Sequence, residues 1–307
     1  MAFPTKPAKV LLSLMTEEND YQRAQLASAE AVARSHGIVL EVLYAQNDAV
    51  TQVQQILTAI QRRDHGIECL IVAPVGTAML NVAEVATNAG IAWCLLNREA
   101  DYISRLRAST RAPVFEVSID QLELGRLQAA QVATLLPSGG TVLYITGPVS
   151  GSSSALRSQG FQEKKPDNIR VKTITGSWTE ESGYRAVTSL LKLSTTRAEG
   201  FSAVVSQNDA MAAGARRAFA EVRESGQQNA WLTMPFLGID GLPSTGQQYV
   251  HRKQLTATII TPAVAGLALD AFVQWRNHGK LIPERMLVNS DSYPAIDKLR
   301  SSVAGAG

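Results

Sequence analysis

Short apolar runs alternate with segments of helical period along most of the chain. The runs lie at 10–14, 38–44, 70–74, 91–97, 114–119, 141–147, 169–175, 202–207, 234–240 and 256–260. Near-continuous apolar runs of this length are typical of parallel strands that are covered on both faces. Between them, segments such as 49–64 and 263–278 place their apolar residues on one face of a helix. The alternation predicts βαβ units and open, doubly wound parallel sheets, which is an α/β fold.

The spacing of the runs divides the chain into two series. Successive strand ends lie roughly 23 to 32 residues apart over 13–97 and again over 147–238, and each step has the size of one βα unit. A polar, arginine-containing segment, 100–113, lies between the two series. After residue 260 one further helix and a short strand at 286–290 remain. We therefore expect two similar α/β lobes and no third domain.

Composition and charge exclude several classes of protein. Of 307 residues, 45% are apolar, which is ordinary for a globular protein and argues against disorder. The net charge of +2 and the lack of a Lys/Arg-rich run give no reason to expect direct contact with nucleic acid. The longest apolar stretch, 257–275, is interrupted by Pro262 and Asp270, so we expect no membrane insertion. Cys69 and Cys94 lie in apolar runs and are expected to be buried free thiols.

The motifs that would mark a metal, a cofactor or a catalytic nucleophile are missing. The sequence has no HExxH, no Cys/His cluster, no GxGxxG after its first strand, no GxxxxGK[ST] and no GxSxG. We expect no metal, no cofactor and no catalytic residue, and hence a protein that is not an enzyme. The nearest anion-binding candidate is the Gly/Ser-rich turn 147–154, which a strand-to-helix turn without ligand also explains. Three histidines precede a glycine and are expected to close helices: His36, His65 and His278.

Polar side chains gather where the predicted strands end, the edge at which open α/β sheets bind ligands. They are Ser13, Asn19, Asp20, Tyr21, Gln22, Asn97, Arg98, Glu99, Ser118, Asp120, Trp178, Gln207, Asn208, Asp209 and Asp240, the last of which is followed by Gly241. Carboxylates, amides and guanidinium groups can bond hydroxyls that both donate and accept, and aromatic rings pack on the apolar face of a sugar. The mixture therefore favours a neutral, polyhydroxylated ligand.

Several of these residues also have a purely structural explanation. Asp20, Asp120 and Asp209 begin helical patterns, where aspartate is a preferred N-cap. Asp240 precedes Gly-Leu-Pro and would suit a turn. Aromatic residues such as Tyr21 and Trp178 are more often half-buried packing residues than ligand contacts. No single residue decides between the two explanations.

The order of these motifs resembles a known family. The most specific strings are VVSQNDAMAAGARRA at 204–218, FLGIDG at 236–241, LRSQGF at 156–161, TATIITPAVAG at 256–266 and WCLLNRE at 93–99. Over about 9–292 they are similar to the type I periplasmic sugar-binding proteins of the ribose- and galactose-binding group. They are similar as well to the effector-binding domains of lac-repressor-type regulators.

The resemblance implies a set of ligand-contacting residues. Asn19 and Tyr21 match the family's Asn and first aromatic after the first strand, whereas Gln22 replaces the second aromatic. Ile260 replaces the family's Gln before the last crossover proline, and Thr261 is the hydroxyl that would take over the contact. These two departures make ribose itself a poor candidate. The implied ligand set is Ser13, Asn19, Tyr21, Gln22, Asn97, Arg98, Arg157, Trp178, Asn208, Asp240 and Thr261.

The resemblance also implies an architecture of two lobes joined by a three-strand hinge, with the ligand cleft between them. The N-terminal lobe would comprise 1–118 plus 261–287, and the C-terminal lobe 119–260 plus 288–307. Four hinge residues are expected: Ser118, Asp120, Ile260 and Pro262. In this family the lobes close around the ligand, and the closed form is what a transporter recognises.

Three alternative functions are consistent with these residues and with the resemblance. The leading one is a solute-binding protein that captures a monosaccharide or polyol and presents it to an ABC transporter permease. The others are the effector-sensing domain of a lac-repressor-type regulator, and an α/β enzyme that acts on a sugar phosphate through 147–154.

The N-terminus has no secretory signal pattern. A periplasmic location therefore requires that a signal was removed, and the chain is cytoplasmic if it is complete as given.

Overall fold

The computed structural model describes residues 7–62, 66–149, 151–193, 200–222 and 231–299. The chain divides into two compact units, each with its own parallel sheet. Unit 1 comprises Met1–Ile119 and Ala263–Val288, and unit 2 comprises Asp120–Pro262 and Asn289–Gly307. The chain therefore passes between the units three times.

Unit 1 is built on a six-stranded parallel sheet. The strand order is β11 (Arg285–Val288), β5 (Val114–Ile119), β4 (Ala92–Leu96), β3 (Ile67–Val72), β1 (Lys9–Leu14) and β2 (Val39–Tyr44). The order reverses at β1, which lies between β2 and β3, as in a doubly wound sheet. Near the carboxyl end of β1, Ser13 is in register with Leu43 of β2 and Val72 of β3.

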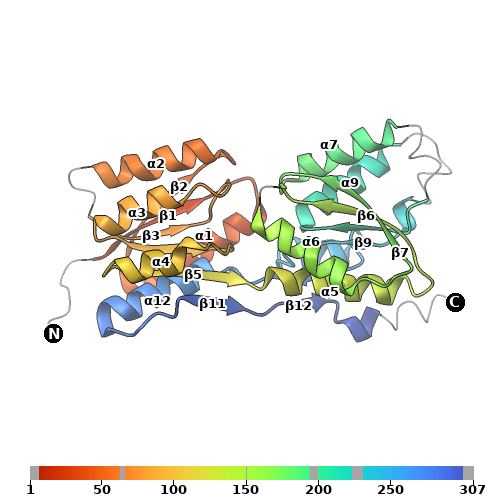
Figure 1. Ribbon diagram of the computed structural model, residues 1–307. Coiled ribbons are helices and arrows are strands. Elements are labelled where there is room, and N and C mark those ends of the chain that lie inside the picture. Colours follow the sequence, from red (N-terminus) through yellow and green to blue (C-terminus); the bar gives the residue numbers. More distant parts are fainter. Residues whose placement is uncertain (1–6, 63–65, 150, 194–199, 223–230, 300–307) are drawn as a thin grey trace. The chain divides into compact units, whose positions relative to one another are not determined.

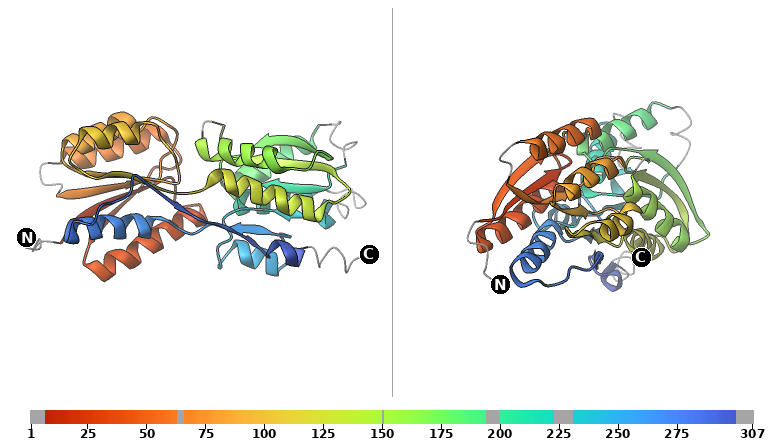
Figure 2. Two further views of the ribbon diagram at one scale, coloured as in Figure 1. Left: turned by 60° about the horizontal axis from the view of Figure 1, so that its bottom comes forward. Right: turned by 60° about the vertical axis from the view of Figure 1, so that its left-hand side comes forward.

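Helices cover both faces of the unit 1 sheet (Figures 1 and 2). On one face, α1 (Asp20–His36) packs against α12 (Ala265–His278), and the backbone N–H of Ala265 donates to Gln25 Oε1 at 2.7 Å. The other face carries α2 (Ala49–Gln61), α3 (Leu80–Asn88) and α4 (Tyr102–Ser109). There Ile56, Val82 and Trp93 form part of one buried cluster with residues of β1, β3 and β4.

The polar segment 100–113, which falls inside the expected N-terminal lobe 1–118, lies in unit 1 and contains α4, a helix that the sequence pattern did not indicate. Ile103 and Leu106, one helical turn apart, are buried in the core. Arg107 donates to the carbonyl oxygens of Val114 at 2.8 Å and Ile282 at 2.7 Å. Because the rest of the segment is polar and contains several arginines, the sequence pattern did not reveal that Ile103 and Leu106 form the buried face of a helix.

Unit 2 contains a four-stranded parallel sheet in the order β7 (Ile169–Thr175), β6 (Gly140–Thr146), β8 (Ala203–Ser206) and β9 (Phe236–Leu237). Two parallel bridges, at Leu237–Ala257 and Asp240–Ile260, connect its edge to β10 (Thr258–Ile260). β12 (Asp291–Tyr293) in turn pairs antiparallel with β10.

Helices flank this sheet as well (Figure 1). α5 (Gln121–Leu135) packs against α6 (Ser152–Lys164), and Phe161 joins Tyr144 of β6 in the cluster beneath them. α7 (Glu180–Leu191) packs against α9 (Asp209–Ala220), over a second cluster that contains Phe219 and Phe236. A short helix, α11 (Gly246–His251), precedes β10.

The strand expected at 234–240 is limited to the two residues of β9, and the chain turns further along at Asp240 and Gly241, whose φ values are 116° and 55°. Other local predictions are confirmed. Gly37 and Gly279 end α1 and α12 in the left-handed conformation, directly after His36 and His278. His65 lies outside the described residues.

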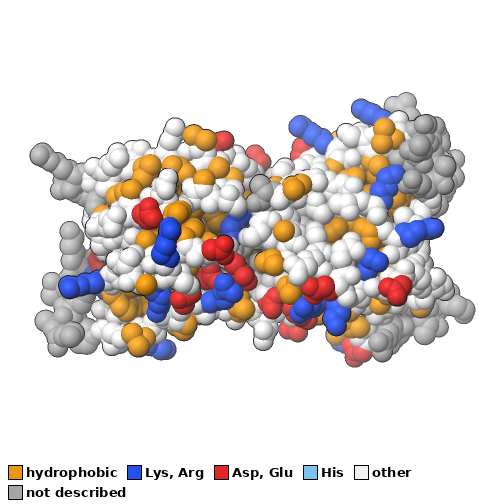
Figure 3. Space-filling model, in the orientation of Figure 1, with side chains coloured by type: hydrophobic (Ala, Val, Ile, Leu, Met, Phe, Trp, Pro, Cys, Tyr) orange, Lys and Arg blue, Asp and Glu red, His pale blue; other side chains and the backbone are white. Residues whose placement is uncertain are grey.

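Both cysteines, Cys69 and Cys94, are buried free thiols, as predicted. None of the helices within the described residues has the length and apolar character that a membrane span requires. On the face drawn in Figure 3, basic and acidic side chains lie scattered among neutral ones.

Candidate functional site

In unit 1, the loop between β1 and α1 carries the first group of predicted ligand residues. Asn19 is the N-cap of α1, and its Oδ1 accepts hydrogen bonds from the N–H groups of Tyr21 at 2.9 Å and Gln22 at 3.2 Å. Gln22 Oε1 accepts from the N–H of Met15 at 3.2 Å. Ser13 is fully buried, and its Oγ accepts from Gln52 Nε2 at 3.0 Å. These side chains therefore shape the end of β1.

The end of β4 carries the second group. Asn97 has a left-handed backbone with φ of 54°, and its Oδ1 accepts a long hydrogen bond of 3.4 Å from Tyr21 Oη. Arg98 donates from Nη1 to the carbonyl oxygen of Gly76. Burial lowers the pKa of the Arg98 guanidinium, against the effect of Tyr102. The structure thus brings Tyr21 and Asn97, 76 residues apart, together at one edge of the unit 1 sheet.

In unit 2, Arg157 projects from α6 into a polar network. Its Nε donates to Gln121 Oε1 at 2.8 Å, and its Nη1 donates to the carbonyl oxygen of Gln207 at the end of β8. Its Cζ lies 5.4 Å from the centroid of the Trp178 ring, in a cation–π arrangement. Arg157 is only 8% exposed, so its direction is set by these neighbours.

Trp178 is held in an unusual backbone conformation. Its φ is 69°, which is rare for a bulky side chain, and its carbonyl oxygen accepts from Asn208 Nδ2 at 2.9 Å. Its ring lies against Gly147, where an added Cβ would be 2.1 Å from Cζ2 of the ring. Asn208 also caps α9, since its Oδ1 accepts from the N–H of Met211 at 2.9 Å. These contacts fix a half-buried indole beside Arg157.

Asp240 is 9% exposed and is held by bonds of its backbone. Its N–H donates to the Ile259 carbonyl oxygen at 3.0 Å, and its own carbonyl oxygen accepts from the N–H of Thr261 at 3.0 Å and from Thr261 Oγ1 at 3.2 Å. Burial raises the pKa of the Asp240 carboxyl well above its ordinary value, Asp209 raises it further, and Arg157 acts in the opposite direction. Arg157 therefore pairs with Trp178 and also acts electrostatically on the Asp240 carboxyl of the same unit.

Asp209 has a different role from the N-cap that its position predicts. Asn208 caps α9, and Asp209 is the first residue inside the helix, just as Asn19 rather than Asp20 caps α1. The carboxylate of Asp209 instead accepts from Thr258 Oγ1 at 2.6 Å and from the N–H of Gly241 at 2.8 Å. Burial raises its pKa to about 7, despite these two bonds, which lower it.

The predicted hinge residues lie at or near the points where the chain passes between the units. Ser118 is buried in β5, and Asp120 is the N-cap of α5, its Oδ1 accepting from the N–H of Glu123 at 2.9 Å. Ile260 ends β10 opposite Asp291 of β12, and Pro262 is exposed. Their hinge role stays a prediction.

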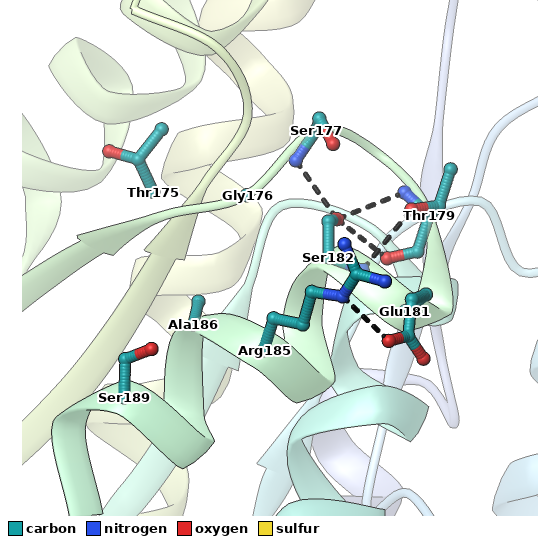
Figure 4. A pocket seen from close by; sticks show the side chains of 9 residues that line it. All are labelled: Thr175, Gly176, Ser177, Thr179, Glu181, Ser182, Arg185, Ala186 and Ser189. Carbon is teal, nitrogen blue, oxygen red and sulfur yellow. Dashed lines mark hydrogen bonds and ion pairs between the residues drawn. The ribbon is translucent and has the colours of Figure 1, made fainter. Parts of the chain in front are cut away.

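A pocket of about 470 Å³ lies in unit 2, where β7 leads into α7 (Figure 4). Ser182 Oγ accepts from the N–H of Ser177 at 2.9 Å and donates to the Thr179 carbonyl oxygen at 2.7 Å. Arg185 is paired with Glu181 at 2.7 Å. None of the predicted ligand residues lines this pocket, and its polar groups bond one another. We therefore do not place the ligand there.

Two residues that support the site, Gln52 and Gln121, were not predicted as part of it, and Gln207, which the sequence places at a strand end, supports the site rather than belonging to the implied ligand set. Gln207 Oε1 accepts from the N–H of Gly147 at 2.9 Å, and Nε2 donates to Tyr144 Oη at 3.1 Å. Gln207 thereby fixes the start of the turn 147–154, of which residue 150 lies outside the described residues. The glutamine of the Gln-Asn-Asp string was the one available signal.

Within the described residues, no three His, Cys, Asp or Glu side chains are placed to hold a metal ion.

Comparisons with known proteins agree on one family and one fold. The family described as periplasmic binding protein domain matches residues 10–271. A D-apiose import binding protein of Actinobacillus succinogenes is 24% identical over 306 residues, which cover 95% of this chain and 92% of the relative. The galactofuranose-binding protein of Escherichia coli is 24% identical over 292 residues, which cover 94% of this chain and 88% of the relative.

Solved structures share the architecture. A galactofuranose binding protein superimposes with a TM-score of 0.80 at 22% identity, covering 97% of this chain and 98% of that one. The Caulobacter myo-inositol binding protein has a TM-score of 0.79 at 21% identity, covering 98% and 97%. These similarities confirm the predicted fold class.

Proposed function

Because the chain belongs to the family of periplasmic binding protein domains, we propose that it binds a monosaccharide or polyol and delivers this ligand to an ABC-type importer. Its relatives include import binding proteins for D-apiose and ribose. Structures of the same fold hold D-allose and myo-inositol. These ligands share a ring or chain of neutral hydroxyl groups, which is the chemistry that the sequence favours.

The observation that carries the proposal is the Arg157–Trp178 pair of unit 2, with Asp240 as a buried carboxyl on which Arg157 acts electrostatically. An indole ring offers a flat apolar surface for the C–H face of a sugar. A carboxylate accepts hydrogen bonds from two neighbouring hydroxyls, and a guanidinium donates to hydroxyl oxygens. Arg157 and Trp178 are held by other contacts of unit 2, so part of the cost of ordering them is met before ligand arrives.

We propose that the unit 1 residues Tyr21, Asn97 and Arg98 bind the same ligand. All three follow the carboxyl ends of β1 and β4, where doubly wound sheets bind their ligands. The three passages of the chain between the units would then act as the hinge on which the units close.

An importer component explains the observations better than a sensor domain or an enzyme. The named import relatives align over nearly their whole length with this chain. The Gly/Ser turn 147–154, which a phosphate-binding enzyme would use, is tied down by Gln207 and by Ser154, whose Oγ donates to the Gly151 carbonyl oxygen at 2.9 Å. We place the protein in the periplasm, where relatives such as the D-xylose-binding protein are named as residing.

A thermal-shift screen tests the proposal. The panel contains D-apiose, D-ribose, D-xylose, D-galactose, xylitol and myo-inositol, with two sugar phosphates as controls. A ligand at about 100 times its Kd adds roughly 2.7 kcal/mol of stability, a shift of several degrees. The Asp240→Asn variant should lose the shift and keep its unliganded Tm within a few degrees. A shift with sugar phosphates alone would contradict the proposal, as would turnover of a bound sugar.

A further inference from the structure

The buried carboxylate of Asp209 connects two motifs that lie far apart in the sequence. Its backbone N–H donates to the Ile239 carbonyl oxygen at 2.7 Å, and its Oδ2 accepts from the N–H of Gly241 at 2.8 Å. Its Oδ1 accepts from Thr258 Oγ1, on β10, at 2.6 Å. Asp209 therefore bonds the residues on both sides of Asp240 and also the strand beside them.

Glycines leave the space that this carboxylate fills. A Cβ on Gly238 would lie 2.0 Å from Asp209 Oδ1, and a Cβ on Gly246 would lie 2.0 Å from Oδ2. A side chain at either position would displace the carboxylate. The first glycine of the Gly-Ile-Asp-Gly string thus serves Asp209, a residue from a different part of the chain.

The turn held in this way has an uncommon backbone conformation. Asp240 has a φ of 116°, and Gly241 follows with 55°. A non-glycine residue in that region costs free energy, so it persists only where surrounding contacts impose it. The backbone bonds of Asp240 to Ile259 and Thr261 supply one side of that constraint, and Asp209 supplies the other.

We propose that Asp209 is a positioning residue for ligand binding, which fixes the turn 238–241 so that the Asp240 carboxylate meets the ligand's hydroxyls. The inference rests on the proposed function, because Asp240 is a ligand residue only there. The charged groups that act on the Asp240 carboxyl are Asp209 and Arg157. Replacing Asp209 by a neutral side chain should therefore change the ionisation of Asp240 as well as the turn.

The first experiment needs no ligand. Hydrogen exchange of the Gly241 amide is measured by NMR in the full chain, in Asp209→Ala and in Asp209→Asn. Alanine removes the acceptor and should accelerate exchange at least about tenfold, since a buried N–H loses its partner. Asparagine keeps one acceptor oxygen and should stay within about threefold of the unmodified protein. Asp20→Ala, which removes the first-turn aspartate of α1, is the matched control and should leave Gly241 unchanged.

The second experiment measures affinity for the panel sugar that gives the largest thermal shift, from pH 5 to pH 8. Asp209→Ala should weaken binding about tenfold or more. In Asp209→Asn the rise of affinity with pH should move to lower pH, because the carboxylate that opposes ionisation of Asp240 is gone. A residue with a merely structural role would not move this profile.

The two experiments separate failure of the inference from failure of the function. Unchanged Gly241 exchange in Asp209→Ala, or an unchanged pH profile in Asp209→Asn, overturns the positioning role. A protein that binds none of the panel sugars contradicts the proposed function, while the exchange measurement still decides whether Asp209 holds the turn.

Discussion

The guanidinium of Arg157 lies over the indole ring of Trp178, with its Cζ 5.4 Å from the ring centroid. Arg157 lies in α6 and Trp178 lies between β7 and α7, 21 positions further along the chain, and each has a second anchor. Gln121 and the Gln207 carbonyl oxygen hold the arginine, whereas Asn208 holds the backbone of the tryptophan. The two side chains are therefore held in place by the protein itself, so that they form an ordered surface before a ligand binds.

Removing the indole should weaken sugar binding. Trp178→Ala loses both the stacking surface and the cation–π partner of Arg157, and we expect the Kd to rise at least about tenfold. Trp178→Phe keeps a ring and should bind within about threefold to fivefold of the unmodified protein. Isothermal titration calorimetry with a panel sugar measures both. Equal affinity of the alanine variant would remove Trp178 from the site.

The close approach of Gly147 to the Trp178 ring gives a second test. Gly147→Ala would place a Cβ 2.1 Å from the ring, so the indole must move. We expect a changed tryptophan fluorescence spectrum and weaker binding by about tenfold. The matched control is Gly200→Ala, where an added Cβ meets no atom within 4 Å. Identical spectra of the two variants would contradict the packing of Trp178 on Gly147.

Stability should fall as pH rises through neutrality. Burial raises the pKa of Asp209 from 3.8 to about 7, so the folded protein holds a proton that the unfolded chain releases. This contribution is complete below about pH 4 and is lost as pH rises to about 7, and Asp240 acts in the same direction. The Tm should therefore drop by several degrees between pH 5 and pH 8. Asp209→Asn should show a flatter profile over that range, and an equally steep one would argue against this assignment.

The pair formed by Arg285 of β11 and Glu116 of β5 should be needed to keep unit 1 stable. Glu116 is 1% exposed, and burial raises its pKa even though Arg285 lowers it. Arg285→Ala leaves the buried carboxyl of Glu116 without its ion-pair partner, and we expect a loss of about 2 kcal/mol in the free energy of unfolding. Urea titrations should show a smaller loss at pH 5 than at pH 8, because burial raises the pKa of the Glu116 carboxyl and so favours its neutral form at the lower pH. The double variant Arg285→Ala/Glu116→Gln should recover part of the loss at pH 8.

The two cysteines should be inert in the folded protein. Cys69 and Cys94 are fully buried, and burial raises the pKa of both thiols far above the usual range. Because the thiolate is the reactive form, iodoacetamide at pH 8 should label neither within an hour, and both in urea. Rapid labelling without denaturant would show that the core of unit 1 opens.

The fold was predictable because the parallel strands correspond to separate apolar runs in the sequence. The runs at 10–14 and 114–119 correspond to β1 and β5 almost residue for residue. The exceptions have a local cause. α4 was missed because only Ile103 and Leu106 are buried in an otherwise polar segment, and β12 was missed because its three residues, Asp-Ser-Tyr, carry no apolar pattern.

The site was predictable only in part. Strand-end position places Tyr21 with Asn97 at one sheet edge, and the structure brings their side chains together. Asp209, however, looks like an N-cap in the sequence, and its partners Gly238, Gly241 and Gly246 are defined by a long-range approach of two loops. A pattern of neighbouring residues in the sequence cannot show that two segments distant along the chain lie this close together. The same holds for Trp178, whose left-handed backbone depends on Asn208.

The three passages of the chain between the units determine the order in which the molecule becomes complete during synthesis. α12 and β11, which finish unit 1, follow the whole of 120–262 in the sequence. β12, which pairs with β10 of unit 2, comes later still. A nascent chain that has reached residue 262 therefore holds most of unit 2 but an unfinished unit 1, whose face under α12 is still exposed. Unit 1 is thus begun first but is completed only after most of unit 2 has been translated, and the parts of β3, β4 and β5 that α12 covers stay exposed during that interval.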